Sequence, residues 1–444
     1  MTSPANTRFS LSPARVLVLG FAGAIALGTL LLLLPLSTAP GKSTGFIDAL
    51  FTATSAVCVT GLVVVDTGTH WSTFGQVVIL ALIQAGGLGI MAMSTMFALL
   101  IGKKITFRER IVIQEALGQP QLSGIVKLTK QILAVTFAIE LAGAVLMTVR
   151  FSRDFPLGTA AWYGLFHSVS AFCNAGFDLL SKSFVDYVDD PFMNLVLMSL
   201  IVLGGIGFVV ISELLWRRCG KRSLHTWIVL KVTSALLVVG FITIFVLEFQ
   251  NEETLGKLSL QGKLLGALFH SVTPRTAGFN TLPTGSLRTP TLLFTMVLMF
   301  IGGSPGGTAG GIKTTTFAAL LASVWATLTR RETIEIHGRR LGQDAAEKAL
   351  AIIVISVGVL ILSALAISTV EQFDFMDIVF ETTSAFGTVG LSTGITPKLS
   401  PLSRMFVIVT MFIGRVGPLT LAFAIATPSR ARALRYPEEK IMIG

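Results

Sequence analysis

Charged residues are scarce in this chain: they make up 13% of its 444 residues, whereas 52% are apolar. Ordinary soluble domains have roughly a quarter of their residues charged, so this composition excludes that class. Cysteine and histidine are scarce too, with three and five copies, and no C-x-x-C pair or histidine cluster occurs. A disulfide framework, a zinc site and a covalent cofactor are therefore not expected.

Long apolar runs are abundant instead. A helix needs about 20 apolar residues to cross the hydrocarbon core of a bilayer. We predict eight such segments, over residues 14–36, 74–101, 126–149, 192–216, 227–249, 291–326, 347–370 and 403–427, of which the sixth is broken. Shorter apolar stretches, predicted to re-enter the membrane without crossing it, lie at 45–57, 160–172, 261–273 and 373–386. The first run is too long for a signal peptide, so we expect it to be retained.

Basic and acidic residues separate by loop. Basic residues follow the second, fourth and sixth segments and fill the tail, among them Lys103, Lys104, Arg108, Arg110, Arg217, Arg218, Lys221, Arg222, Arg330, Arg331, Arg339, Arg340, Arg430 and Arg432. Acidic residues occupy the opposite loops, among them Asp48, Asp66, Asp178, Asp189, Asp190, Glu252, Glu371 and Asp377.

The positive-inside rule then predicts a multi-pass protein of the cell inner (plasma) membrane with both termini in the cytoplasm. The short helices enter from outside, where the acidic side should concentrate cations. The formal net charge of +10 is explained by this topology and does not indicate a nucleic-acid partner.

The four short stretches repeat one pattern. They read ALFTATSAVCVTGL (49–62), GLFHSVSAFCNAGF (164–177), ALFHSVTPRTAGF (267–279) and IVFETTSAFGTVGL (378–391). In each, a Phe is followed nine or ten residues later by a Gly that precedes an apolar residue. This predicts an all-α integral membrane protein: four tandem helix–pore loop–helix repeats, with eight transmembrane spans, around a pseudo-fourfold pore. The repeats cover 14–101, 126–216, 227–326 and 347–427, and residues 428–444 form a cytoplasmic C-terminal tail.

The residues at the repeated Gly suit a cation path. A dehydrated cation needs oxygen ligands, and four converging loops of backbone carbonyls supply them without net charge. Gly permits the φ and ψ values that aim successive carbonyls at one axis. We therefore predict a selectivity filter made of Val59, Thr60, Gly61, Asn174, Ala175, Gly176, Thr276, Ala277, Gly278, Thr388, Val389 and Gly390. One such Gly alone is equally typical of a helix C-cap, but four at near-constant spacing favour the filter.

A Gly-rich break and a mid-span Arg predict a gate below this filter. Residues 301–314 read IGGSPGGTAGGIKT, and no helix continues through such a density of Gly and Pro. The predicted gate residues of this segment are Gly302, Gly303, Gly306, Gly307, Gly310, Gly311 and Lys313. Arg415 stands where the other second helices have Gly, and we predict that it bonds the loop and blocks the pore. The alternative is a structural brace, for example to Glu140.

Three other motifs are weaker. The Gly-rich run before Lys313 lacks the G-x-x-x-x-G-K-[ST] pattern of a phosphate loop, because Ile312 precedes the Lys. Arg275 lies inside the third filter stretch, and we predict that it braces the loop from behind against Glu381. His167 and His270 occupy matching positions, where packing or a polar bond is expected rather than metal binding.

The stretches TGL, NAGF, PRTAGFN and TVGLST, together with IGGSPGGTAGGIKT and IGRVGPLT, resemble the Trk/Ktr/HKT superfamily of potassium transporters. The resemblance covers the chain from about residue 14, and the eight-span count and the ending RYPEEKIMIG are most similar to Ktr-type membrane subunits. It implies K+ as the transported ion, with Na+ as a candidate activator. It also implies a membrane homodimer and a separate cytosolic ring of nucleotide-binding regulatory subunits. Some sodium-favouring plant relatives have Ser at the first filter position, where this chain has Gly61.

A channel-like pore for potassium uptake, not an enzyme, is therefore the main hypothesis. A sodium-selective or poorly selective pore is the nearest alternative. A transport-coupled membrane enzyme would require a nucleotide motif or a phosphorylatable Asp motif, and neither occurs. A sensor with a vestigial pore is disfavoured by the intact glycines, and an alternating-access carrier would show inverted repeats rather than parallel ones.

Cysteine labelling tests the predicted orientation. A cysteine at Lys103 or Arg339 should react with a membrane-impermeant reagent only from the cytoplasmic side, whereas one at Asp189 should react only from outside. Reversed labelling in intact cells and inverted vesicles would place the predicted filter on the wrong face.

Overall fold

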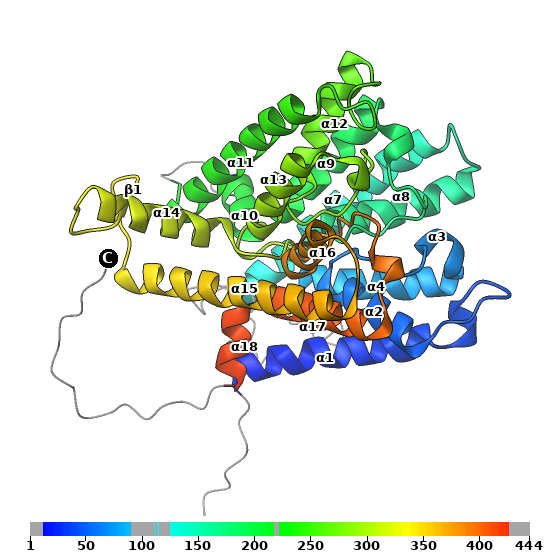
Figure 1. Ribbon diagram of the computed structural model, residues 1–444, viewed down its shortest axis with the longest axis horizontal. Helices are drawn as coiled ribbons and strands as arrows, with labels where there is room; N and C mark the ends of the chain where they lie inside the picture. Colours follow the sequence, from blue (N-terminus) through cyan, green and yellow to red (C-terminus); the bar gives the residue numbers. More distant parts are fainter. Residues whose placement is uncertain (1–11, 90–110, 112–113, 115–124, 217–221, 426–444) are drawn as a thin grey trace, which may run out of the picture.

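The computed structural model describes residues 12–89, 111, 114, 125–216 and 222–425 of the chain, and these residues are mostly helical (Figure 1). Four helices are long and apolar enough to cross a membrane: α1 (Pro13–Leu32), α7 (Ile125–Phe151), α11 (Leu224–Glu248) and α15 (Gln343–Val370). Each is the first helix of a predicted repeat. Much of their surface is exposed Leu, Val, Ile and Phe, which is typical of contact with lipid.

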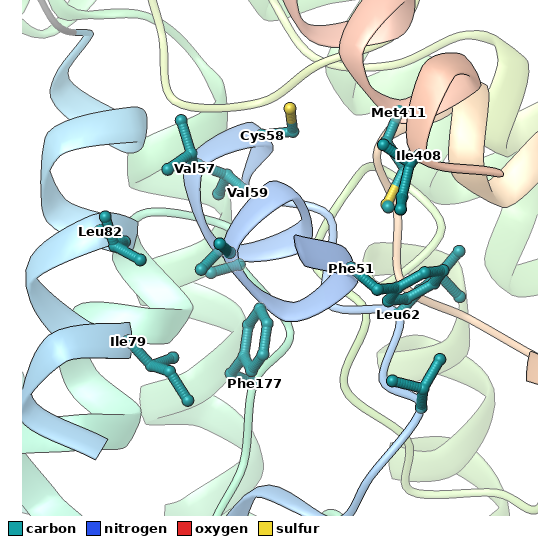
Figure 2. Packing of buried hydrophobic residues seen from close by; sticks show 14 of the residues in the cluster. Phe51, Val57, Cys58, Val59, Leu62, Ile79, Leu82, Phe177, Ile408 and Met411 are labelled. Carbon is teal, nitrogen blue, oxygen red and sulfur yellow. The ribbon is translucent and has the colours of Figure 1, made fainter. Parts of the chain in front are cut away.

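A short helix follows each long one. These helices are α2 (Phe46–Cys58), α8 (Leu157–Phe172), α12 (Leu260–Val272) and α16 (Phe375–Gly387). Their C-terminal halves are buried, including the repeated Phe51, Phe166, Phe269 and Phe380. Figure 2 shows this packing at α2, where Phe51 lies near Ile408 of the fourth repeat and Phe177 of the second repeat lies close by. The core of the molecule therefore surrounds these short helices.

The second helices end or bend at Gly residues. They are α4 (Thr73–Leu88), α9 (Pro191–Gly205), α13 (Thr289–Phe300) and α17 (Pro401–Val416). The chain turns by 101° between α9 and α10 (Phe208–Trp216), and by 93° between α17 and α18 (Pro418–Ile425). We predicted unbroken segments over 192–216 and 403–427, and that was wrong. The reason is the left-handed backbone of Gly207 (φ 93°) and Gly417 (φ 91°), which stops the helix.

The sixth segment is broken as predicted: residues 301–313 separate α13 from α14 (Thr314–Leu328). The four long helices and the two bent pairs give up to six spans within the described residues. The second predicted segment continues past α4 into residues 90–101, outside the described part of the chain. The count of eight therefore stays a prediction, while at least four described helices have the length and composition of membrane spans.

Close backbone contact explains why the second helices repeat a Gly in the same register. A Cβ atom on Gly86, Gly204 or Gly414 would overlap the carbonyl oxygen of Val57, Phe172 or Phe386, respectively. Each of these carbonyls lies four residues before a repeated Gly of the predicted filter. The second helix thus packs directly against the end of its short helix, which a side chain would prevent. In the third repeat, Gly302 packs instead against Gly310.

Both described ends of the chain lie together. The Arg15 Nε donates to the Ala424 carbonyl oxygen at 2.8 Å, which joins the start of α1 to the end of α18. The hairpin of β1 (Glu335–Ile336) and β2 (Arg339–Arg340) lies at the same end of the molecule (Figure 1). The predicted 428–444 tail lies outside the described residues.

Acidic loops meet at the other end. Arg150 pairs there with Asp154 at 2.7 Å and with Asp190. Arg404 pairs with Asp48. The remaining short elements are α3 (Thr67–His70) and the 3-10 turns Pro35–Ser37, Val185–Tyr187, Thr284–Ser286 and Thr396–Lys398.

A Gly86→Ala substitution tests the close contact. It should destabilise the protein by about 1–3 kcal/mol, because the added methyl group must displace the Val57 carbonyl. The matched control is Gly23→Ala in α1, where nothing lies within 4 Å of the new Cβ, so stability should hold or rise. Thermal melting of both variants in detergent measures the difference, and equal melting would refute the contact.

Candidate functional site

Four loops, one from each repeat, meet at a single place. A Cβ on Gly61 would overlap the carbonyl oxygen of Ala175, and one on Gly176 would lie 2.9 Å from that of Ala277. In the same way, a Cβ on Gly278 would overlap the carbonyl oxygen of Val389, and one on Gly390 would overlap that of Thr60. The contacts therefore run from each repeat to the next and back to the first. These contacts join eight of the twelve predicted filter residues, namely the four Gly and the residue before each of them.

The backbone of the ring is left-handed at two positions in every repeat. The four Gly have φ between 69° and 94°. Two residues earlier stand non-Gly residues with positive φ: Val59 (58°), Asn174 (58°), Thr276 (73°) and Thr388 (50°). Positive φ is unfavourable for β-branched residues and persists only where surrounding structure enforces it. We did not predict this feature, since no sequence rule assigns such a conformation to Val or Thr.

The position of the helix caps bears on the C-cap alternative. The left-handed caps of α2 and α16 are Val59 and Thr388, not Gly61 and Gly390. In both repeats the Gly lies two residues beyond the cap, where it contacts the neighbouring loop. A capping role therefore does not account for these two Gly residues.

Hydroxyl groups on the short helices hold the ring. The N–H groups of Gly61 and Gly390 donate to Ser55 Oγ and Ser384 Oγ, each at 3.1 Å. In the other two repeats the hydroxyl donates instead: Ser170 Oγ to the Phe177 carbonyl at 2.8 Å, and Thr273 Oγ1 to the Phe279 carbonyl at 2.7 Å. We missed these four residues, although a hydroxyl stands at nearly the same place in all four repeated stretches.

The 302–311 loop lies against the ring. The side-chain amide of Asn174 is 2.9 Å from the Thr308 hydroxyl. A Cβ on Gly310 would overlap Thr388 Oγ1. A hydrogen bond joins the two ends of the loop, where Ser304 Oγ lies 2.9 Å from Thr314 Oγ1. Its two ends therefore stay together while its middle touches the second and fourth loops of the ring.

The bend after α9 holds the same loop. The N–H groups of Ser304 and Thr308 donate to the carbonyl oxygens of Gly205 and Gly204, at 2.9 and 3.1 Å. Phe208 N–H in turn donates to the Gly306 carbonyl at 2.8 Å. These bonds replace the helical hydrogen bonds that the bend removes.

Three cationic side chains donate to carbonyls of this loop. Arg415 bonds the Thr308 carbonyl and the Gly86 carbonyl of α4, both at 2.5 Å. Lys313 Nζ bonds the Ala309 carbonyl at 2.7 Å. Arg275 bonds the Gly302 carbonyl at 3.1 Å. Across residues 12–89, 125–216 and 222–425, none of the three has a carboxylate within ion-pair distance.

Two predicted pairings need correction. Arg275 and Glu381 do not pair, because Glu381 accepts hydrogen bonds from Ser392 at 2.8 Å and from Thr396. Arg275 instead connects the third loop of the ring to the 302–311 loop.

Glu140, the partner in the brace alternative, also lies elsewhere. Its carboxylate accepts from Gln84 at 3.2 Å and from the Cys173 thiol at 3.7 Å. As expected, the His ring nitrogens make polar contacts, His167 with the Tyr163 carbonyl and His270 with Thr295. In the described part of the chain, no three His, Cys, Asp or Glu gather as metal ligands.

A cavity of about 490 Å³ opens on the other side of the ring, facing the acidic loops. All four Gly of the ring line it, and so do polar residues of the following loops, namely Asp178, Ser181, Lys182, Ser183, Asn280, Ser392 and Thr396. The ring thus lies between a cavity lined by polar residues and a loop held by cations.

The TrkH family model, described as a cation transport protein, matches residues 21–434. The chain belongs to the TrkH family. Members of this family are transporters rather than enzymes. The chain is 44% identical to Ktr system potassium uptake protein B of Bacillus subtilis over 434 residues, covering 98% of this chain and 97% of the relative.

Two further comparisons extend this result. The chain is 41% identical to the potassium/sodium uptake protein NtpJ of Enterococcus hirae, covering 99% of both. Among solved structures, the potassium transporter TrkH from Vibrio parahaemolyticus superposes with a TM-score of 0.77 at 20% identity, covering 96% of this chain and 87% of that one. At that identity the structural match establishes the fold alone.

Proposed function

We propose that the chain is the pore-forming subunit of a potassium-uptake system, through which K+ enters by channel-like permeation. The observation that supports this most is the ring of four Gly, each packed on a carbonyl of the next repeat. Backbone carbonyls from four loops replace the water shell of a dehydrated K+ without adding charge. The C-terminal ends of the four short helices point toward the ring and favour a cation.

The relatives support K+ as the ion. Two of them are named for potassium uptake or potassium/sodium uptake and match almost the whole chain. An inward-negative membrane potential supplies about 2.3 kcal/mol per charge for every 100 mV. Sodium enters the proposal as a candidate activator, because the name of one relative includes both ions.

The 302–311 loop is the proposed gate. It touches the ring at Asn174 and Thr388, and Arg415 holds it from the far side. A fixed positive charge at this point repels K+, and the loop itself occupies the path. Opening would require the Thr308 carbonyl to leave Arg415. Lys313 bonds the Ala309 carbonyl within the loop and Arg275 bonds its first residue, Gly302, so opening would also have to break the bonds of Thr308 to Asn174 and Gly204.

The assembly is proposed from the resemblance to Ktr systems. This resemblance implies a homodimer in the cell inner membrane and a cytosolic ring of nucleotide-binding subunits. The basic loops, predicted on the cytoplasmic side with both termini, would form the docking face for that ring.

Uptake and competition test the proposed filter. The chain should rescue a potassium-uptake-deficient bacterium at low K+, with Na+ competing poorly against K+. Gly61→Ser should increase Na+ competition roughly tenfold, because its Cβ displaces the Ala175 carbonyl.

The matched control for this test is Gly41→Ser. Gly41 also has positive φ (78°), but nothing lies within 4 Å of its Cβ position. Its competition profile should match the wild type. Unchanged selectivity in Gly61→Ser would refute the filter assignment.

Uptake rates test the proposed gate. Shortening the 302–311 loop and substituting Arg415→Ala should each raise the initial rate of K+ uptake per inserted protein. Their effects should combine sub-additively, since both remove the same closed state. Arg415→Lys distinguishes the effect of the positive charge from that of the hydrogen bonds to the loop. It keeps the charge but makes fewer hydrogen bonds, so its uptake rate should fall between those of the wild type and Arg415→Ala.

The brace alternative gives a different outcome. There, losing Arg415 would remove a donor from the Thr308 and Gly86 carbonyls and reduce the yield of inserted protein. Slower normalised uptake in both single variants would exclude the gate while leaving the filter intact.

A further inference from the structure

The cavity beyond the ring is asymmetric in charge. The residue two positions after each repeated Gly lines it, and these four are Val63, Asp178, Asn280 and Ser392. Only the second repeat has a carboxylate at this position. Among the described residues that line the cavity, Asp178 is the only acid and Lys182 the only base.

We propose that Asp178 sets the affinity of the pore for external K+, and that protonation of Asp178 lowers this affinity in acidic medium. The inference rests on the proposed function of the ring. It assigns to a single repeat a task that the other three do not share.

The position of Asp178 is fixed from two sides. Its Oδ1 accepts from the Leu180 N–H at 3.0 Å, which forms a tight turn after the ring. This turn docks on the third repeat: Asn280 N–H donates to Ser183 Oγ at 3.0 Å, and Phe184 N–H donates to the Asn280 carbonyl at 2.8 Å. A carboxylate held in this way acts on an approaching ion as a fixed charge.

Partial burial makes this charge both effective and titratable. Burial raises the pKa of Asp178 to about 6, helped by the negative charge of Asp66 and opposed by backbone N–H donors of its turn. Above that pH Asp178 is negative and attracts cations strongly, because little water screens it. Below that pH it is neutral and the attraction is lost.

Other charged or titratable groups lie around Asp178. Asp66 caps the start of α3. Lys182 is exposed on the turn that follows Asp178. His167 accepts from the Leu179 N–H at 3.1 Å, and Glu381 bonds Ser392, which lines the cavity. The experiment must therefore separate Asp178 from these neighbours.

The decisive variant is Asp178→Asn. It keeps an oxygen that can accept from the Leu180 N–H, removes the charge and replaces the second oxygen by an NH2 group. In potassium-uptake-deficient cells, the KM of wild-type uptake for external K+ should rise roughly three- to tenfold between pH 7.5 and pH 5. Asp178→Asn should show that higher KM already at pH 7.5, with no further rise at pH 5 and an unchanged maximal rate.

Asp189→Asn is the matched control. Asp189 is an exposed acid of the same face that does not line the cavity. Because outer pH also alters the driving force, every KM is compared with that of this control at the same pH. Lys182→Met should shift the KM the other way, by less than roughly twofold, since its charge is exposed and screened.

The outcomes distinguish failure of the Asp178 proposal from failure of the proposed pore function. A wild-type KM for Asp178→Asn at pH 7.5, or an acid response that persists in this variant, would overturn the proposal. If the variant fails to insert, a wild-type KM equal at both pH values would overturn it. Absence of K+-dependent uptake by the wild-type chain would instead refute the pore.

Discussion

The structure depends on one steric constraint: four stretches of backbone approach one another so closely that no side chain fits between them. Each repeated Gly lies against a carbonyl oxygen of the next repeat. Bringing backbones to this distance requires the short helices to end at the same depth, and hydroxyls from these helices fix the loops that follow. It also requires the second helices to press on the short ones, which Gly86, Gly204 and Gly414 allow.

A second feature is that, within the part of the chain that the structure describes, no carboxylate pairs with the three cations that bond the 302–311 loop. A charge in the membrane interior is costly unless polar groups receive it, and here the receiving groups are carbonyl oxygens. A carbonyl is neutral, so breaking an Arg–carbonyl bond leaves no uncompensated negative charge behind, whereas breaking an Arg–Glu pair would. The 302–311 loop is therefore held by Arg415, Lys313 and Arg275 without buried ion pairs.

Much of the architecture follows from local pattern. The four Gly, the hydroxyl before each and the broken sixth segment are visible in one sequence because each depends on neighbours along the chain. The bends at Gly207 and Gly417 were missed, because a single Gly in an apolar run is also compatible with a continuing helix. The pairing of Arg275 with Gly302 rather than Glu381 was missed for another reason: both carbonyl and carboxylate are acceptors, and only tertiary packing selects between them.

One consequence follows from all four loops belonging to one chain. In a pore built from four identical subunits, one codon change alters the ring four times. Here it alters a single quarter, so the positions two residues before the Gly can differ; they are Val59, Asn174, Thr276 and Thr388, all with positive φ. The 302–311 loop meets the ring through side chains that differ between repeats, namely Asn174, Arg275 and Thr388. The main chain of the ring is thus alike in all four repeats, whereas its side chains let the 302–311 loop meet the second, third and fourth quarters of the ring through different groups.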